Sequence, residues 1–518
     1  MQVAGKKITK YDIALLGIVL IGIFLRLYHL GTQSFWLDEA ISVSISKLSL
    51  AQIVQADRHP PLYYWLLHYW MMVFGTSESA VRLLSALFGV LAIPMCYVVG
   101  RQLFDKEVGL VAALILAFST FNVQYSQEAR MYSLMVLLAF LSMYFFIRLA
   151  RQSTLALSAG YVLSTTLLVY THVYGLFVVI AQDIYLVTLL FLSKNRTYRL
   201  RHFAFLQASV AALFAPWMLS VLIPRTLQLE NAGSNLAAPT IADLIYTFST
   251  YAGTAVLLVL FLGLSVLSLF GYQKVRGSMD WKAPLKALED YSWEARIQDA
   301  APVYFLVVWL VAITLIPFII SRFSSPIYLE RYAIAASVAL YILVAKGINN
   351  INYRYARIAV VGIIIVLSVA NLQGYYTSIT KPQAREATSF IDAHLKNGDV
   401  VLVSPDYHSA VFNYYTNRTD AVIRPLRSWE IVDKPSYDST TPSINRTEDK
   451  ITEIQSDVNG HDRVWFFAAN FSAGKAAENF TLTILNESYV SVYAKTFAAG
   501  RFGSTSYGYD VYLFEKRT

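Results

Sequence analysis

Long apolar segments separated by short polar ones fill roughly the first three quarters of the chain. A run of about 20 apolar residues is long enough to cross the hydrocarbon core of a membrane as a helix. About eleven segments approach this length, with boundaries accurate to several residues. They lie at about 11–30, 81–100, 108–124, 131–149, 155–170, 174–192, 203–222, 243–272, 302–320, 332–346 and 357–373. This pattern predicts a polytopic α-helical membrane protein with about 11 transmembrane helices.

The segment 59–74 is also apolar, but it begins with Pro60-Pro61 and is rich in His and Tyr, which favours a helix lying in the membrane interface. The distribution of charge supports this interpretation. If the segment does not cross, the basic clusters, including Lys194 to Arg201, fall in cytoplasmic loops, as the positive-inside rule requires. If it crosses, that cluster lies outside. We therefore expect a cytoplasmic N-terminus, a retained first helix, and a first outer loop at 31–80 that contains juxtamembrane helices.

The composition changes after the last apolar segment. Residues 383–397 have the spacing of an amphipathic helix, and 400–404, 464–469 and 507–514 have the composition of strands. We predict a membrane domain at 1–375 and a soluble extracytoplasmic α/β domain at 376–518, which is large enough for a core of its own. Asn-X-Ser/Thr sequons agree with an outside location; they begin at Asn417, Asn445, Asn470, Asn479 and Asn486.

Overall composition narrows the function classes. The chain is 56% hydrophobic and only 15% charged, and its net charge of +8 comes from short basic clusters between apolar segments rather than from a nucleic-acid-binding surface. The one cysteine, Cys96, excludes a disulfide framework and a cysteine-ligated zinc site. No P-loop or other glycine-rich nucleotide loop is present, so use of a soluble nucleotide-sugar donor is unsupported.

Charged and polar residues gather on one predicted side of the membrane. Asp38 and Glu39 follow the first apolar segment, where a charge is costly and is usually functional, although two acidic residues can also simply begin a solvated loop. With the topology above, further polar residues share the outer side with them: Asp57, Arg58, His59, Glu128, Arg130, His172 and Arg331.

This set has the groups that sugar transfer from a phosphate requires. Transfer to a hydroxyl or amide needs a base for the acceptor proton and positive charge for the departing phosphate. Asp38 is the preferred base. Arg331 suits a phosphate because a guanidinium binds it bidentately, although pairing with Glu330 is an alternative. His172 is open to two interpretations, a substrate contact or a hydrogen-bonded histidine at the interface.

A divalent metal ion is a second use for the same side chains. Carboxylates and water are the ligands that hard cations prefer, and the candidates are Asp38, Glu39, Asp57, His59 and Glu128. The alternative interpretation pairs the carboxylates with Arg58 and Arg130. The sequence leaves both open.

Four motifs occur in order over about the first 150 residues: FWLDEA, RHPPLYYWLLHYWMMVFG, ESAVRLLSALFGV and YSQEARMYSL. In these motifs the chain resembles the integral-membrane glycosyltransferases of the GT-C class, in particular the branch of the protein O-mannosyltransferases and the lipid A aminoarabinose transferase. In the rest of the chain only THVYG at 171–175 and ERY at 330–332 remain as points of likeness.

The resemblance implies a glycosyltransferase of the cell membrane that moves a hexose or pentose from a dolichyl or undecaprenyl phosphate to an extracytoplasmic protein, glycan or lipid, with inversion at the sugar carbon. It implies Asp38 and Glu39 as the catalytic pair. It also makes other motif residues the expected substrate contacts: Arg58, His59, Tyr63, Glu128, Arg130, Tyr132, His172 and Arg331. Metal dependence varies within the class. The alternative function is a polyprenyl-lipid or sugar transporter, but the internal repeats and the helices broken at the membrane midplane that are typical of transporters are not evident, and the charges gather at one face.

Overall fold

The computed structural model describes residues 2–3, 6–192, 197–232, 237–270, 300–426, 444–502 and 505–517. Two of the basic groups expected in cytoplasmic loops, 194–196 and 274–286, lie outside these residues. The chain divides into two compact units. Unit 1 contains residues 1–28, 48–75 and 81–376, and unit 2 contains 29–47, 76–80 and 377–518. Each unit is described by itself.

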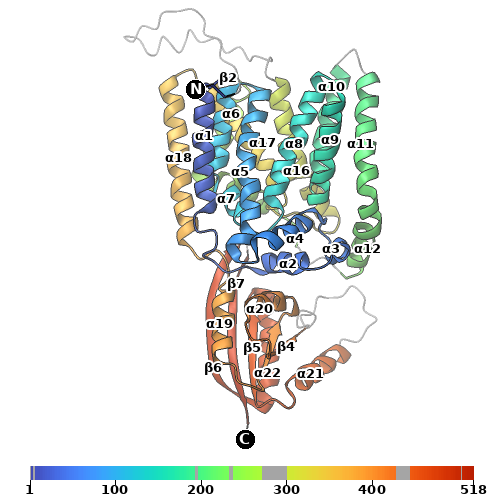
Figure 1. Ribbon diagram of the computed structural model, residues 1–518, viewed down its shortest axis with the longest axis vertical. Helices are drawn as coiled ribbons and strands as arrows, with labels where there is room; N and C mark the ends of the chain where they lie inside the picture. Colours follow the sequence, from blue (N-terminus) through green and yellow to red (C-terminus); the bar gives the residue numbers. More distant parts are fainter. Residues whose placement is uncertain are drawn as a thin grey trace, which may run out of the picture. The chain divides into compact units, whose positions relative to one another are not determined.

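Unit 1 is helical apart from the short strands β1 (Gln2–Val3) and β2 (Lys6–Lys7) (Figure 1). Its helices are α1 (Lys10–Leu27), α3 (Leu50–Ala56), α4 (Leu62–Phe74), α5 (Glu78–Leu103, whose first three residues belong to unit 2), α6 (Lys106–Phe118), α7 (Thr120–Ser126), α8 (Tyr132–Arg151), α9 (Leu155–Thr171), α10 (Gly175–Leu192), α11 (Thr197–Trp217), η1 (Met218–Leu222), α12 (Ile223–Ala232), α13 (Ile241–Ala252), α14 (Ala255–Leu267), α16 (Ala300–Phe323), η3 (Ile334–Ala336), α17 (Ser337–Asn349) and α18 (Arg354–Thr377). Every apolar segment predicted from the sequence falls on a helix or a pair of helices.

The membrane character of unit 1 is clear, although fewer helices than predicted qualify as complete spans. Among the described residues, five helices are long and apolar enough to cross a membrane, and seven are if each bent pair counts as one span. Three further helices are apolar but shorter. The prediction of a multi-helix membrane protein is therefore confirmed, and the count of eleven crossings stays a prediction.

Two of the predicted segments are broken. Helices α6 and α7 meet at an angle of 61°, and α13 and α14 at 89°. Ser119 ends α6 with extended backbone and caps the start of α7, because its hydroxyl accepts a hydrogen bond from the amide of Asn122. Gly253 has a φ of +93°, which a glycine adopts without strain, and Thr254 then caps α14. Hydropathy alone does not reveal these turns, so the expectation that no helix is broken is wrong at both places.

A buried arginine braces the first break. Arg26 of α1 is fully buried and donates from Nη1 to the carbonyl of Ala117 at 3.3 Å and from Nη2 to that of Leu116 at 3.2 Å. These carbonyls belong to the last turn of α6, whose acceptors lack helical partners. Gln127, which follows α7, donates in turn to the carbonyls of Arg26 and Tyr28. These contacts fix the entrance to the turn at 127–131.

Helix α4 covers the segment that was ambiguous in the sequence. Its 13 residues span about 20 Å, which is shorter than the hydrocarbon core of about 30 Å. One side is buried, with Tyr63, Tyr64 and Leu67, whereas Met72 and Val73 are exposed. A helix of this length with an exposed apolar side suits the membrane interface.

Unit 2 is an α/β domain (Figure 1). Its elements are α2 (Leu37–Ser46), α19 (Ala384–His394), β3 (Val400–Ser404), η4 (Asp406–His408), α20 (Ser409–Tyr415), β4 (Val422–Pro425), α21 (Ile444–Val458), β5 (Arg463–Ala469), α22 (Ser472–Ser488), β6 (Tyr489–Phe502) and β7 (Thr505–Lys516). The sheet order is β4-β3-β5-β7-β6. Strand β3 is parallel to β4 and β5, and β7 is antiparallel to β5 and β6.

Helices cover both faces of this sheet, so β3 is apolar from Val400 to Val403, as expected of a buried parallel strand, and its last residue is Ser404. Val401 and Val403 face a core that contains residues of α19 and α20, and Val400 and Leu402 face a core with α21 and α22. Ala40 of α2 is fully buried in the first core. Helix α2, which carries the Asp-Glu pair of the first outer loop, is therefore built into the C-terminal domain.

Candidate active site

The Asp-Glu pair lies in the first turn of α2. Trp36 is the N-cap, and its amide donates to the Glu39 carboxylate at 3.4 Å. Both carboxylates are placed where the helix dipole favours negative charge. Their environments differ, because Asp38 is partly exposed and Glu39 is fully buried. Asp38 is therefore the one of the pair that solvent or a substrate can reach.

Glu39 is held by a lysine that sequence reasoning did not select. The Nζ of Lys381 lies 2.9 Å from Oε2 of Glu39, and the side chains are 4% and 0% exposed. Lys381 follows α18 in the sequence Ser-Ile-Thr-Lys-Pro, which has no motif or periodicity that points to the first outer loop. Only the folded structure reveals this pair.

In unit 1, a second group forms around Asp57. Its Oδ2 lies 2.9 Å from Nδ1 of His59 and accepts a hydrogen bond from the Tyr64 hydroxyl at 2.6 Å. Burial by itself would raise the pKa of Asp57, but the charge and hydrogen bond of His59, with Arg130 and Tyr64, hold that pKa well below its usual range. Asp57 is therefore a stable anion that orients His59.

Arg130 joins the same group from the turn between α7 and α8. Its Nη1 donates to the Tyr64 hydroxyl at 3.2 Å, and it is 3% exposed. Tyr63, also buried, shares a 2.8 Å hydrogen bond with Ser85, whose hydroxyl donates to the Arg130 carbonyl. Tyr63 thus supports the turn that carries Arg130.

His172 lies between α9 and α10 with four aromatic rings around it. Its ring centroid is 4.8 Å from that of Tyr332, 5.5 Å from those of His59 and Tyr174, and 6.3 Å from that of Tyr132. Nδ1 accepts from the Tyr174 amide at 3.1 Å, so the neutral ring carries its proton on Nε2. Within the described part of the chain, this buried Nε2 has no hydrogen-bond partner.

The charges around His172 are mainly positive. Burial is the largest cause that lowers its pKa, and the nearby charges of His59, Arg130 and Arg331 lower it further, whereas Asp57 opposes them. Arg331, which precedes η3, also stacks its guanidinium over Tyr332 at 5.6 Å. Three basic side chains therefore lie within electrostatic range of one buried, neutral hydrogen-bond donor.

The remaining predicted residues are less central. Arg58 is exposed, and its amide donates to Oδ1 of Asp57 at 2.6 Å. Glu128 is fully buried, and its carbonyl accepts from the amide of Arg130. Unit 1 brings together five of the residues predicted from the sequence, His59, Arg130, Tyr132, His172 and Arg331. Tyr64 and Tyr332, which were not predicted, lie among them. The YY and ERY motifs that contain them were the available signals.

Among the described residues, no three His, Cys, Asp or Glu side chains form a group that could hold a metal ion. Asp57 and Glu39 are instead engaged by His59, Tyr64 and Lys381. Metal dependence stays a prediction.

Known proteins resemble parts of this sequence. Residues 58–220 match the model of the dolichyl-phosphate-mannose-protein mannosyltransferase family. A protein of Aquifex aeolicus whose function is uncharacterised is 28% identical over 108 residues, which is 19% of this chain and 22% of the relative.

Two solved structures are similar over almost the whole chain. ArnT from Cupriavidus metallidurans matches with a TM-score of 0.59 and 12% identity over 97% of both chains, and it has also been solved with undecaprenyl phosphate. The oligosaccharyltransferase AglB from Archaeoglobus fulgidus, in complex with an inhibitory peptide and a dolichol-phosphate, matches with a TM-score of 0.53 and 13% identity over 96% of this chain and 74% of its own. The chain therefore has the GT-C fold of integral-membrane glycosyltransferases, as its motifs predicted.

Proposed function

We propose that the protein transfers a sugar from a polyprenyl phosphate, of the dolichyl or undecaprenyl type, to an extracytoplasmic acceptor with inversion at the sugar carbon. The observation that carries this proposal is the group around His172. A buried Nε2–H without a partner among the described residues, surrounded by His59, Arg130 and Arg331, suits a phosphate oxygen. The family match over 58–220 and the lipid phosphates bound to ArnT and AglB support the same donor class.

The chemistry divides between two groups of residues. The acceptor oxygen, or the nitrogen of an amide acceptor, attacks the anomeric carbon, the bond from that carbon to the phosphate oxygen breaks, and the polyprenyl phosphate leaves with the electron pair. Asp38 takes the acceptor proton and releases it to solvent, since it is the partly exposed member of the pair. Arg130, Arg331 and His172 stabilise the charge that develops on the leaving phosphate. No strong acid is required, because a phosphate is a good leaving group.

The substrates determine the topology that we propose. The protein lies in the cell membrane with about eleven crossings, a cytoplasmic N-terminus, and unit 2 on the extracytoplasmic side. In this arrangement α4 lies along the outer interface, where a lipid-borne sugar arrives. Acceptors that fit are a protein hydroxyl or amide, a glycan, or a lipid headgroup.

Purified protein in lipid with radiolabelled polyprenyl-phosphate sugars tests the proposal. Protein, glycan and lipid acceptors should be supplied in parallel, because the expected result is transfer of label to one of these classes. Release of sugar to water alone would not support the acceptor reaction. Movement of the labelled lipid across the membrane without transfer would favour a transporter and overturn the proposal.

A further inference from the structure

The first outer loop is fixed to the segment that begins unit 2. The Oε1 of Gln33 accepts hydrogen bonds from the backbone amides of Thr380 and Lys381, both at 2.9 Å, and its Nε2 donates to the carbonyl of Ser378 at 3.2 Å. One amide side chain thus sets the register of residues 378–381 against the start of the loop. Lys381 takes its place opposite α2 because of this register.

The backbone at the start of α2 is held by side chains of the C-terminal domain. The amide of Phe35 donates to the hydroxyl of Tyr415 on α20, and the amide of Leu37 donates to the hydroxyl of Tyr507 on β7 at 3.3 Å. The first four amides of a helix lack partners within the helix, and that of Leu37 finds one in a tyrosine distant in sequence.

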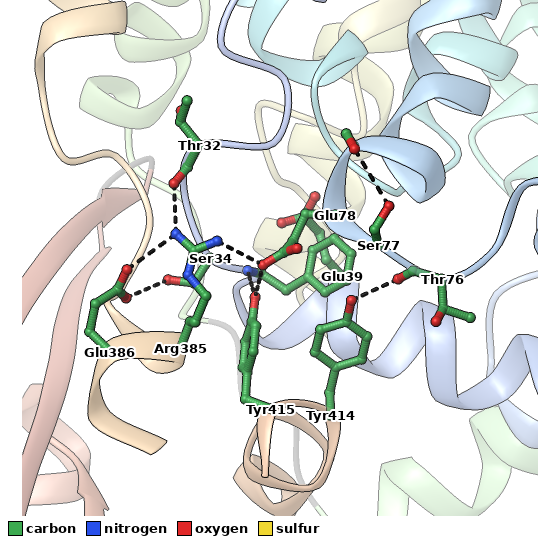
Figure 2. Close-up of polar contacts among 12 residues, drawn as sticks. Thr32, Ser34, Glu39, Thr76, Ser77, Glu78, Arg385, Glu386, Tyr414 and Tyr415 are labelled. Carbon is green, nitrogen blue, oxygen red and sulfur yellow. Dashed lines mark hydrogen bonds and ion pairs between the residues drawn. The ribbon is translucent and has the colours of Figure 1, made fainter. Parts of the chain in front are cut away.

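A polar network beside α2 ties the same domain to both ends of the loop (Figure 2). Arg385 of α19 pairs with Glu78 at 3.0 Å and donates to the carbonyl of Thr32 at 2.8 Å. Glu78 also accepts from Tyr415 at 3.1 Å, and Ser34 donates to Glu386 at 3.3 Å. The loop therefore has fixed ends and a fixed start of α2.

The ion pair of Lys381 and Glu39 differs from this network because both partners are buried. A buried carboxylate that loses its partner must take up a proton or water, and either change disturbs its surroundings. Glu39 is in the first turn of α2, next to Asp38 and one residue before Ala40, which is packed in the domain core. Because Ala40 is held in the core, the first turn of α2 has little freedom to accommodate such a change at Glu39.

We propose that Lys381 is a positioning residue that acts through Glu39 to hold Asp38 in its reactive orientation, so that the C-terminal domain is part of the catalytic assembly. The inference rests on the proposed function, in which Asp38 is the base. Lys381 lies outside the motifs of the first outer loop, so these motifs do not indicate this role. Lys381 itself exchanges no proton with the acceptor.

The test is Lys381→Met in the full-length protein in lipid, assayed with a saturating polyprenyl-phosphate sugar and its best acceptor. We expect turnover to fall by about ten- to a hundredfold, since small displacements of a reacting group have effects of this size. The KM for the donor should stay within about threefold of wild type, because phosphate stabilisation is assigned to unit 1. Lys381→Arg should retain more turnover than Lys381→Met.

A matched control separates positioning from general stability. Lys475 of the same unit also pairs with a buried carboxylate, Glu478, at 2.9 Å, but it lies on α22. Lys475→Met should leave turnover unchanged even if it lowers the melting temperature. In a Glu39→Gln background, Lys381→Met should change turnover by less than about threefold, because the partner charge is already gone.

Amide hydrogen exchange of residues 36–46 supplies a measurement that is independent of activity. These amides should exchange faster in Lys381→Met than in Lys475→Met. Equal exchange in the two variants, or wild-type turnover in Lys381→Met, would overturn the inference. If wild-type protein transfers no sugar, the proposed function fails instead, and exchange still reports whether Lys381 orders α2.

Discussion

The hydroxyl of Tyr64 accepts a hydrogen bond from Nη1 of Arg130 at 3.2 Å and donates one to Asp57 at 2.6 Å. A tyrosine of α4 thereby connects an arginine between α7 and α8 to a carboxylate between α3 and α4. This connection sets the orientation of both charged groups in the proposed donor site.

Tyr64→Phe should therefore weaken donor use while the protein stays folded. The loss of hydrogen bonds to charged groups corresponds to about 1.5 to 3 kcal/mol, so the KM for the donor should rise by about ten- to a hundredfold. Steady-state kinetics at several donor concentrations measures this change. Tyr69→Phe, at an exposed tyrosine of the same helix, is the control and should behave as wild type. An unchanged KM in Tyr64→Phe would show that the connection is only structural.

Arg331→Lys should lower donor affinity by about ten- to a hundredfold, because an ammonium does not reproduce the bidentate guanidinium contact with a phosphate. Binding of radiolabelled polyprenyl phosphate measures the effect without turnover. Arg322→Lys, at an exposed arginine of α16, is the matched control. Wild-type affinity in Arg331→Lys would indicate that this residue only stacks on Tyr332 or pairs with Glu330.

Asp38→Asn should reduce turnover by about 10² to 10⁴, the usual contribution of a general base, with donor binding and melting temperature little changed. Asp420→Asn, at an exposed aspartate of unit 2, should have no such effect. Near wild-type turnover in Asp38→Asn would contradict the assignment and make Glu128 the next base to test. Glu39→Gln should reduce turnover less than Asp38→Asn.

Chelation with EDTA distinguishes the two interpretations of the carboxylates. If Asp38 and Glu39 share a divalent ion, chelator should lower wild-type turnover to that of Glu39→Gln. Because Glu39 is paired with Lys381, we expect turnover to be insensitive to chelation. Restoration of lost activity by added Mg²⁺ or Mn²⁺ would favour the metal interpretation.

The proposed topology predicts which side of the membrane each loop faces. In a Cys96→Ala background, a cysteine at Thr483 on α22 should react with an impermeant maleimide added from outside. A cysteine at Ser153, between α8 and α9, should react only after the membrane is made permeable. Both positions are exposed. Labelling of Ser153→Cys alone from outside would reverse the assignment of the loops.

His408 should make unit 2 less stable in acid. It is buried against Tyr509, and burial lowers its pKa from 6.5 to about 3. Between these values the unfolded chain binds a proton that the folded one does not, so stability falls as pH decreases, by up to about 1.4 kcal/mol per pH unit. Melting curves from pH 7 to pH 4 should show this slope. His408→Gln should flatten it, and His394→Gln, at an exposed histidine, should not.

The apolar pattern by itself determined the class of this protein and the identity of its helices. A helix that crosses a membrane needs a long run of apolar residues that are consecutive in the sequence. Such runs are therefore recognisable from the sequence alone, and each predicted segment proved helical. The strands at 400–404 and 464–469 were readable for the same local reason, since a strand buried on both faces is apolar at nearly every position. The order of motifs over the first 150 residues also indicated the GT-C class.

Only the tertiary structure determined which side chains pair with the charged residues. Lys381 and Glu39 are separated by most of the chain, and no local preference of either residue records their pairing. The breaks at Ser119 and Gly253 and the assignment of α2 to unit 2 depend likewise on which distant groups satisfy a backbone or a charge. The sequence named the candidate side chains, because charge next to apolar segments is conspicuous. The fold determined which side chains hold them, because burial and hydrogen bonding are properties of the packed molecule.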